Sequence, residues 1–443
     1  MIAKVSALTA QLQERARARG PITIGLAGAG QMGTDIVVQV AQMEGLRIGA
    51  IAELDMPLAT AATRLAGHAS DEVKEAGTST EVDRVIEAGK IALTQDFEAL
   101  AAAGRIDVVI DATGNPNAGT THALSALRHG KHIVMLSVEA DITVGRHLKR
   151  EAKRSGLVYT GAAGDEPAAS LELIGFAQSI GLQVIAAGKG KNNPLKFDAV
   201  PGDYEAEARA RNMNARMLVE FVDGSKTMIE MVAVANATGL VPDRPGMHGP
   251  AATVSELARV LVPSSAGGIL AKAGCVDYSI GKGVAPGVFC VVTSEHPRLR
   301  ERLADLKVGE GPYFTLHRPF HLTSLEVPLT AARAVLFNRP DMEPLDHPVA
   351  EAVAVAKRDL SSGEILGRIG ESDYRAWAMT AAEAQDLEAL PVGLAERAKV
   401  LKPVRKGELL TRANCAADGS LAVTQIREAL DRADRDERFR AAS

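Results

Sequence analysis

Residues 23–33 read TIGLAGAGQMG, a segment that connects an apolar run to a helical pattern through a GxGxxG spacing. In this spacing the first glycine makes a tight turn, the second lets a pyrophosphate approach the backbone, and the third permits close packing of helix on strand. Glu53 closes the next apolar run, at the distance where a carboxylate can bind ribose hydroxyls. An ordinary glycine turn would need neither the flanking strand nor the acid, so we predict a dinucleotide site. Its expected cofactor-binding residues are Gly28, Gly30, Gln31, Met32, Gly33 and Glu53.

The composition is that of a soluble globular protein with two or three domains. Of the 443 residues, 46% are hydrophobic and 24% are charged, and the formal net charge is −5. Basic residues are neither in excess nor clustered, which argues against a nucleic-acid surface. The three cysteines are too few for a disulfide framework or a zinc site. Because we see neither a signal peptide nor an apolar run of about 20 residues, we expect a cytoplasmic protein that does not enter a membrane.

Strand and helix patterns alternate through residues 1–158. Residues 106–111 and 131–136 read as further buried strands, whereas residues 55–96 read as a polar helical insertion. The alternation predicts a Rossmann-type doubly wound parallel sheet, an α/β fold. Its ligand crevice lies at the carboxyl ends of the strands, and the residues expected there beside the nicotinamide are Thr113, Gly114 and Glu139.

The remaining chain changes character twice. We expect an α+β catalytic and dimerisation domain with an antiparallel sheet over residues 159–346, including strands at 227–234 and 287–293. A small β domain follows over 347–426, because short apolar runs there are broken by Ser-Gly-Glu and Lys-Gly-Glu turns. The charged stretch 427–443 is expected to be a solvated helix or tail.

A dense polar cluster follows the apolar run that ends at Ala187. It holds Lys189, Lys191, Asn192 and Asn193 within a glycine-flanked strand end. Lysines supply point charges and asparagines supply orienting hydrogen bonds, a combination that suits a phosphate or a polyhydroxylated anion. We therefore take the two lysines as candidate catalytic residues and the two asparagines as substrate-binding residues. A basic surface loop is the alternative.

Other candidate site residues lie in nearby turns. Asp165 and Glu166 follow a glycine-rich turn, where they could hold a divalent cation, transfer protons or begin a helix at Pro167. Asn212, in a predicted helix over 203–217, and His248, in a loop, are further substrate-binding candidates. The two histidines His317 and His321 flank a proline that forbids a helix, so we expect no zinc pair there.

Several blocks of the chain resemble the 1-deoxy-D-xylulose-5-phosphate reductoisomerase-like (DRL) family, a group of homoserine-dehydrogenase-like oxidoreductases with a C-terminal SAF domain. The blocks cover nearly the whole chain and lie at residues 28–37, 111–114, 138–141, 164–167, 188–195, 211–214, 224–228, 235–240, 247–250 and 311–314. The resemblance implies a homodimeric, NADPH-dependent enzyme. It would use Mg²⁺ or Mn²⁺, held by Asp165 and Glu166, to convert 1-deoxy-D-xylulose 5-phosphate to 2-C-methyl-D-erythritol 4-phosphate, an isoprenoid precursor.

Two residues depart from what the resemblance implies. Glu139 stands where homoserine dehydrogenases carry a lysine, which disfavours plain homoserine oxidation. Glu53 would repel a ribose 2′-phosphate about 4 Å away by roughly 4 kcal/mol at an effective dielectric constant near 20, which favours NAD over NADP. The hypotheses from sequence are thus a DRL-type NAD(P)-dependent oxidoreductase, a simple dehydrogenase of a hydroxy acid, polyol phosphate or homoserine-like substrate, and a non-catalytic dinucleotide sensor. The expected partner is a small anionic substrate.

Overall fold

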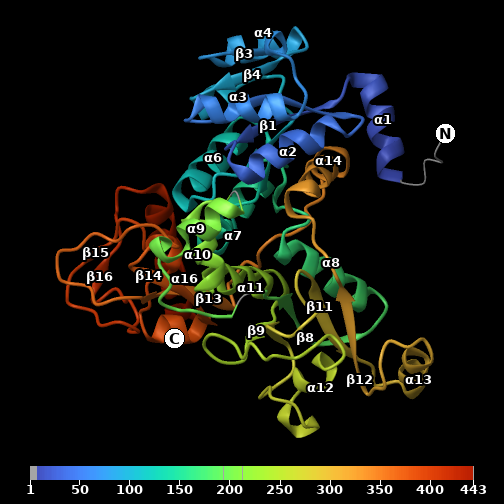
Figure 1. Cartoon of the computed structure of the whole chain (residues 1–443), viewed down its shortest axis with the longest axis vertical. Coiled ribbons are helices and arrows are strands. Elements are labelled where there is room, and N and C mark those ends of the chain that lie inside the picture. The colour runs from blue at the N-terminus through green and yellow to red at the C-terminus, as the bar shows by residue number, and fades with distance from the viewer. Residues whose placement is uncertain (1–6, 193, 212, 443) are drawn as a thin grey trace. The chain divides into compact units, whose positions relative to one another are not determined.

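The computed structural model describes residues 7–192, 194–211 and 213–442 (Figure 1). The chain divides into two compact units, which are taken separately below. The first unit contains residues 1–165 and 322–343, and the second contains residues 166–321 and 344–443. No helix among the described residues is both long enough and apolar enough to cross a membrane.

The first unit is built on a seven-stranded parallel sheet in the order β3-β4-β2-β1-β5-β6-β7. The strands are β1 (Ile22–Ala27), β2 (Leu46–Ala52), β3 (Val73–Glu75), β4 (Ile91–Thr94), β5 (Val108–Asp111), β6 (His132–Met135) and β7 (Tyr159–Gly161). The helices are α1 (Ala7–Arg19), α2 (Gln31–Ala41), α3 (Met56–Leu65), α4 (Ser79–Glu87), α5 (Phe97–Ala101), α6 (Pro116–Arg128), α7 (Val138–Arg154) and α14 (Val327–Phe337). This arrangement confirms the predicted Rossmann-type doubly wound sheet.

The sheet of the first unit is wider than its sequence indicates. Residues 55–96, read above as a helical insertion, contain β3 and β4, and β4 pairs directly with β2. Both strands are too short, at three and four residues, to stand out as a periodic pattern. At the other edge β7 completes the sheet, so the predicted boundary at residue 158 precedes its last strand. Residues 322–343 also belong to this unit, where α14 packs against the β-strand core through Val327 and Ala331.

The second unit begins with a five-stranded mixed sheet in the order β12-β11-β8-β10-β9. Its strands are β8 (Gln183–Gly190), β9 (Val241–Pro242), β10 (Cys275–Ser279), β11 (Val288–Thr293) and β12 (Tyr313–Arg318). The pairs of β11 are antiparallel, as predicted, whereas β10 runs parallel to β8 and β9. The helices of this region are α8 (Glu166–Ser179), α9 (Glu205–Ala210), α10 (Ala215–Val222), α11 (Ser225–Thr238), α12 (Leu257–Val260) and α13 (Pro297–Asp305).

Two segments of the second unit differ from the sequence-based expectation. Residues 227–234, predicted as a strand from their β-branched side chains, lie inside the buried helix α11, which starts after Gly224 and stops at Gly239. Both glycines have left-handed backbone angles, which suit helix ends better than strand interiors. The predicted helix over 203–217 is broken into α9 and α10, because Asn214 accepts a hydrogen bond from the N–H of Arg216 and starts a new helix.

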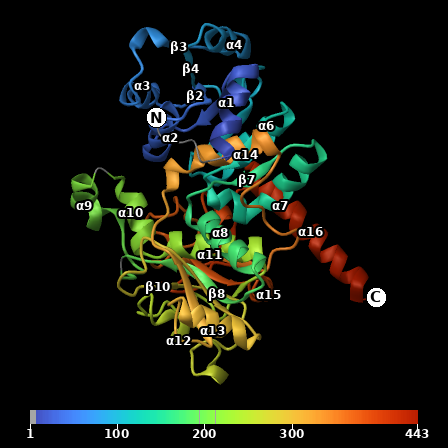
Figure 2. The same ribbon diagram turned by 90° about the vertical axis from the view of Figure 1, so that its right-hand side faces the viewer.

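The C-terminal part of the second unit contains two short antiparallel pairs (Figure 1) and a terminal helix (Figure 2). The elements are β13 (Ala350–Ala356), β14 (Tyr374–Thr380), α15 (Ala381–Asp386), β15 (Lys399–Val400), β16 (Cys415–Ala416) and α16 (Ala422–Ala442). Helix α11 packs against α8 and β10 and also contacts β13 and β14. It therefore lies between the mixed sheet and the C-terminal strands.

Candidate functional site

The glycine loop of the first unit has the geometry that its sequence predicts. Gly28 has a φ of +91°, and a Cβ there would lie 3.0 Å from the carbonyl oxygen of Ala112. A Cβ on Gly33 would lie 2.0 Å from the carbonyl oxygen of Gly28, so α2 can approach β1 only with glycine at this position. Gly30, at the N-terminus of α2, faces no atom of the chain within 4 Å. The space beside it is open at the positive end of a helix, where a phosphate can bind.

Glu53 is attached to this loop. Its carboxylate accepts hydrogen bonds from the N–H of Ala29 at 2.7 Å and from the N–H of Asp55 at 3.0 Å. The Glu53 carboxylate therefore stabilises the glycine turn by accepting these hydrogen bonds, and its negative charge lies next to the turn. The neighbouring predicted cofactor residues Gln31 and Met32 are the first two residues of α2, one exposed and the other half-buried.

The other predicted cofactor residues lie at the ends of β5 and β6. The hydroxyl of Thr113 donates to the buried carboxylate of Asp111 at 2.9 Å, and Gly114 has a φ of +62°. The second oxygen of Asp111 lies 2.6 Å from Nδ1 of His122, which sequence reasoning did not single out. Glu139 is buried in the first turn of α7. Because parallel strands end at one edge, these residues line the edge where ligands bind in such sheets.

The second unit contains a buried cluster of charged side chains around Lys189. This lysine extends from β8, and its Nζ donates to Glu166 Oε1 at 2.5 Å and to Glu230 Oε2. Glu166 is the first residue of α8 and Glu230 lies in the middle of α11. Nε2 of His321 lies 3.4 Å from Glu166 Oε1, and Nζ of Lys226 lies 3.7 Å from Glu230 Oε1.

The two carboxyl groups of this cluster have different affinities for a proton. Burial alone would raise the pKa of Glu166, but the adjacent charges of Lys189 and His321 outweigh it and hold that pKa below its ordinary value. For Glu230, burial and then the negative charge of Glu166 raise the pKa to about 7, although Lys189 opposes them. Burial lowers the pKa of Lys189, but its two carboxylate partners raise it above the ordinary range. The cluster therefore holds a charged lysine, an ionised Glu166 and a Glu230 that exchanges its proton near neutral pH.

Lys191, the other candidate lysine, is not part of this cluster. It follows β8 directly, is buried, and donates from Nζ to the carbonyl oxygen of Phe221 at 2.5 Å. Burial, followed by the positive charge of Lys189, lowers the pKa of Lys191 to about 8. A buried lysine that still carries charge at neutral pH is suited to bind an anion.

The fit of a divalent cation at Glu166 is poor. Its carboxylate is occupied by Lys189, whose ammonium supplies positive charge between Glu166 and Glu230 where a metal ion would have to sit. Asp165 is buried and directly precedes Glu166 in the chain, outside the second unit. Asp165, Glu166 and Glu230 are nevertheless all buried and place carboxylate oxygens within 4.8 Å of one another, so the expectation of a metal held by Asp165 and Glu166 stays a prediction.

A second possible ligand set lies in the C-terminal part of the second unit. His347, Asp434 and Glu437 place ligand atoms within 4.8 Å of one another, beside a cavity of about 530 Å³. His347 and Glu437 are solvent-exposed. Exposed acidic groups of this kind are common without a metal.

The remaining predicted substrate residues are dispersed. Asn192 is exposed, whereas Asn193 and Asn212 lie outside the described residues. Nε2 of His248 lies 2.8 Å from Asp243 Oδ2. The backbone N–H of His248 donates to the carboxylate of Asp277. His248 therefore holds a loop beside β10 and does not contact Lys189.

Sequence reasoning missed three members of the Lys189 cluster, namely Lys226, Glu230 and His321. Glu230 interrupts the apolar run Met228-Ile229-Glu230-Met231-Val232, and an isolated carboxylate in such a run was the available signal. His321 was considered only as a partner of His317 in a zinc pair. In the structure His321 contacts Glu166 instead, and because the two residues are far apart in the sequence, no local pattern connects them.

Comparison with known protein families matches two regions of the chain. Residues 28–160 match the family described as homoserine dehydrogenase, NAD binding domain. Residues 164–327 match the family described as oxidoreductase DRL, catalytic domain, and this region contains the whole Lys189 cluster. A comparison with curated proteins gave no significant match.

Solved structures that resemble this chain include several dehydrogenases at low sequence identity. A probable dehydrogenase from Thermotoga maritima is 13% identical, covers 72% of this chain and 90% of its own, and has a TM-score of 0.42. A putative myo-inositol dehydrogenase from Sinorhizobium meliloti is 14% identical with the same coverages and a TM-score of 0.36. Scyllo-inositol dehydrogenase from Lactobacillus casei is 14% identical, covers 67% and 76%, and has a TM-score of 0.33. These likenesses are too distant to indicate a substrate.

The chain thus joins an NAD-binding Rossmann domain to an oxidoreductase DRL catalytic domain, the make-up of an NAD(P)-dependent oxidoreductase.

Proposed function

We propose that this oxidoreductase interconverts an alcohol and a carbonyl group on a small anionic substrate, with Lys189 as the residue that exchanges a proton with the substrate oxygen. The observation that supports the proposal is the buried ammonium of Lys189 between the carboxylates of Glu166 and Glu230. Reduction of a carbonyl needs a hydride at carbon and a proton at oxygen. Bound NAD(P)H supplies the hydride.

The three side chains have different tasks in this proposal. Glu166 stays ionised and keeps Lys189 protonated, so that an N–H of the lysine can be donated to the oxygen as negative charge develops there. Glu230, with a pKa of about 7, then returns a proton to Lys189. In the direction of alcohol oxidation the same protons move in reverse. The balance is one proton and one hydride for each carbonyl reduced.

Lys189→Ala tests this assignment. We expect kcat/KM to fall by about 10²- to 10⁴-fold, because proton transfer by a positioned side chain contributes about that much. Lys282→Ala, which removes the same charge at an exposed position of the same unit, should leave kcat/KM unchanged. Binding of NADH, followed by fluorescence, should be retained in both variants. Retained turnover in folded Lys189→Ala would remove the lysine from the reaction.

A second candidate is the reductoisomerase reaction that the resemblance of the sequence to the DRL family implies. It would require a divalent cation as well as NAD(P)H, because the skeletal rearrangement needs vicinal oxygens held together. Incubation with 1-deoxy-D-xylulose 5-phosphate, either with Mg²⁺ or with EDTA, separates the two candidates. Cofactor oxidation that depends on Mg²⁺ and yields 2-C-methyl-D-erythritol 4-phosphate would establish the reductoisomerase and overturn the metal-free proposal.

Two further expectations belong to the same proposal. The negative charge of Glu53 favours NAD over NADP, and a homodimer is expected from the family resemblance. Light scattering coupled to size-exclusion chromatography measures the second directly. A non-catalytic sensor, the remaining alternative, would bind NAD(P)H but show no turnover with any carbonyl or hydroxyl compound offered.

A further inference from the structure

Arg375 of β14 occupies an unusual environment in the second unit. Its guanidinium carbon lies 4.3 Å from the centre of the Phe197 ring and 4.5 Å from the centre of the Trp377 ring. Its only hydrogen bond among the described residues is a long one, 3.5 Å, to the carbonyl oxygen of Ala376. The rings therefore hold the guanidinium in place while most of its N–H donors have no acceptor.

Other arginines of the same unit are neutralised by carboxylates. Arg216 pairs with Glu220, Arg358 with Glu364 and Asp373, and Arg427 with Glu351 and Asp431. Arg375 forms no such pair with any residue that the structure describes. Burial lowers its pKa to about 10, which leaves it fully charged at neutral pH.

Lys191 is a second buried cation without a carboxylate in contact. Its side chain reaches the carbonyl oxygen of Phe221, at the end of α10. Within the described part of the chain it forms no ion pair, in contrast to Lys189 two residues earlier, which contacts two carboxylates. A partial charge on a carbonyl oxygen does not neutralise an ammonium group, so its positive charge remains available.

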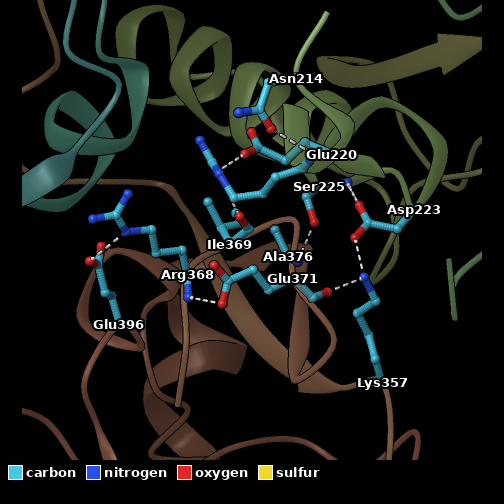
Figure 3. Close-up of polar contacts among 11 residues, drawn as sticks. Asn214, Glu220, Asp223, Ser225, Lys357, Arg368, Ile369, Glu371, Ala376 and Glu396 are labelled. Carbon is cyan, nitrogen blue, oxygen red and sulfur yellow. Dashed lines mark hydrogen bonds and ion pairs between the residues drawn. The ribbon is translucent and has the colours of Figure 1, made fainter. Parts of the chain in front are cut away.

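Arg375 and Lys191 approach the same short junction between α10 and α11, residues 221–225. Lys191 contacts Phe221. The N–H of Ala376, the residue after Arg375, donates to Ser225 Oγ at 2.9 Å, and Figure 3 shows this hydrogen bond. Lys196 also contacts this junction, since its backbone N–H donates to the carbonyl oxygen of Val222, and the ring of the next residue, Phe197, stacks on Arg375. The charge of Asp223 influences both cations.

The negative charge at this junction is already balanced. Asp223 accepts from Nζ of Lys357 at 3.0 Å and from the N–H of Ser225 at 2.8 Å, as Figure 3 shows. With Asp223 neutralised by Lys357, no carboxylate among the residues that the structure describes forms an ion pair with Lys191 or Arg375. The N-terminus of the 14-residue helix α11 begins here and adds the positive end of its dipole.

We propose that Lys191 and Arg375 form a subsite for an oxyanion, a phosphate ester or a carboxylate, on the substrate of the reaction proposed above. The inference rests on that proposed function for the identity of the ligand as substrate. It assigns to the C-terminal part of the chain, through Arg375 of β14, a direct part in substrate choice. Of the two cations, Arg375 can offer two parallel N–H donors to two oxygens, and Lys191 contributes a point charge.

The position of this subsite matches the chemistry proposed for the cluster around Lys189. Lys189 and Lys191 are separated by one residue, and β8 ends between them at Gly190. A small substrate whose anionic end is held beyond the end of β8 would therefore have its remaining atoms near the strand that carries Lys189. The arrangement predicts substrates of a few carbon atoms with an anionic group at one end.

Binding of inorganic phosphate and of acetate to the full-length protein tests the proposal, and isothermal titration calorimetry measures each Kd. We expect Arg375→Gln and Lys191→Gln each to weaken binding of the preferred anion at least tenfold. Arg405→Gln removes the same charge from an exposed position in the C-terminal part and should leave Kd unchanged. Preference for phosphate would indicate a phosphate ester, and preference for acetate a carboxylate.

Controls separate this proposal from that of the Lys189 reaction. Lys189→Ala should still bind the anion, with a Kd that changes less than in Lys191→Gln, even if turnover is lost. Because Arg375 also packs between two rings, Arg375→Lys is a second variant that keeps the charge; it should retain more anion binding than Arg375→Gln at the same melting temperature. Equal Kd values for wild type, Arg375→Gln and Arg405→Gln would overturn the subsite, whatever the outcome for turnover.

Discussion

The carboxylate of Glu53 accepts a hydrogen bond from the N–H of Ala29 at 2.7 Å, which connects the end of β2 to the glycine loop before α2. The negative charge is thus held beside the turn by the backbone of the turn itself. A ribose 2′-phosphate near this carboxylate would meet repulsion of several kcal/mol.

We expect Glu53→Ser to change cofactor preference. The ratio of kcat/KM for NADPH to that for NADH should rise by about 100-fold or more, since about 1.4 kcal/mol corresponds to a factor of ten. Steady-state assays with both reduced cofactors measure this ratio. Glu75→Ser, which removes an exposed charge from β3, should leave it unchanged; an unchanged ratio in Glu53→Ser as well would show that this carboxylate does not select the cofactor.

Substitutions at two glycines of the loop should affect cofactor binding and the thermal stability of the protein separately. A methyl group on Gly33 would lie 2.0 Å from the carbonyl oxygen of Gly28, so Gly33→Ala should lower the melting temperature of the protein. Gly30→Ala meets no atom of the chain within 4 Å and should leave the melting temperature nearly unaltered. It should nevertheless weaken NADH binding, because its methyl group would occupy the space left for the pyrophosphate. If Gly30→Ala bound NADH normally, the cofactor would have to lie elsewhere.

The pH dependence of the reaction should report Glu230. Its pKa is raised from 4.5 to about 7, chiefly by burial. In carbonyl reduction the protonated form is required, so kcat should decline as the pH rises through about 7, whereas kcat for alcohol oxidation should increase. Glu230→Gln should abolish the inflection near pH 7 in both directions. An inflection that persists in this variant would assign the titration to another group.

The same raised pKa has a consequence for folding. Between pH 4.5 and about 7 the folded protein binds a proton at Glu230 that the unfolded chain has already released. This group therefore favours the folded state at low pH, and its contribution is lost as the pH rises through that window. Denaturant titrations of wild type and Glu230→Gln at pH 5 and pH 8 would reveal the difference.

Lys357 and Asp223 form a buried ion pair whose disruption should be costly. Both side chains are almost inaccessible, at 1% and 0% exposure, and their atoms lie 3.0 Å apart. Lys357→Met should destabilise the second unit by about 3–5 kcal/mol at pH 7, because it leaves the buried carboxylate of Asp223 without a cation to balance its charge. The double variant with Asp223→Asn should recover part of this loss. Urea unfolding measures both, and the exposed control Lys402→Met should have little effect.

The parts of the fold that could be predicted from sequence are those with local signals. β1, β2, β5 and β6 are mostly apolar runs, and the glycine spacing identifies the first turn. β4 has only four residues, and β3 has three, so their pairing with longer neighbours decides their structure. Helix α11 was misread because β-branched residues are as compatible with a buried helix as with a buried strand.

The candidate site was only partly visible for a related reason. Lys189 and Glu166 stand in glycine-rich segments at element ends, where a polar residue attracts notice. Glu230 lies inside an apolar helix, and Arg375 lies between Tyr374 and Ala376 in the mostly apolar strand β14. Their roles depend on which side chains tertiary packing brings beside them, and neither spacing nor composition contains that information.

Helix α11 begins after a left-handed glycine at 224 and stops at another at 239, and its side chain Asn236 accepts hydrogen bonds from the N–H groups of Val349 and Ala350. The two glycines therefore fix where α11 begins and ends, and the hydrogen bonds of Asn236 fix its rotation about the helix axis. One residue added before Glu230 would turn that carboxylate by about 100° around the helix axis, away from Lys189. Insertions and deletions are therefore compatible with this site only outside α11. The number of residues from Gly224 to Glu230 must be kept for the Glu230 carboxylate to face Lys189.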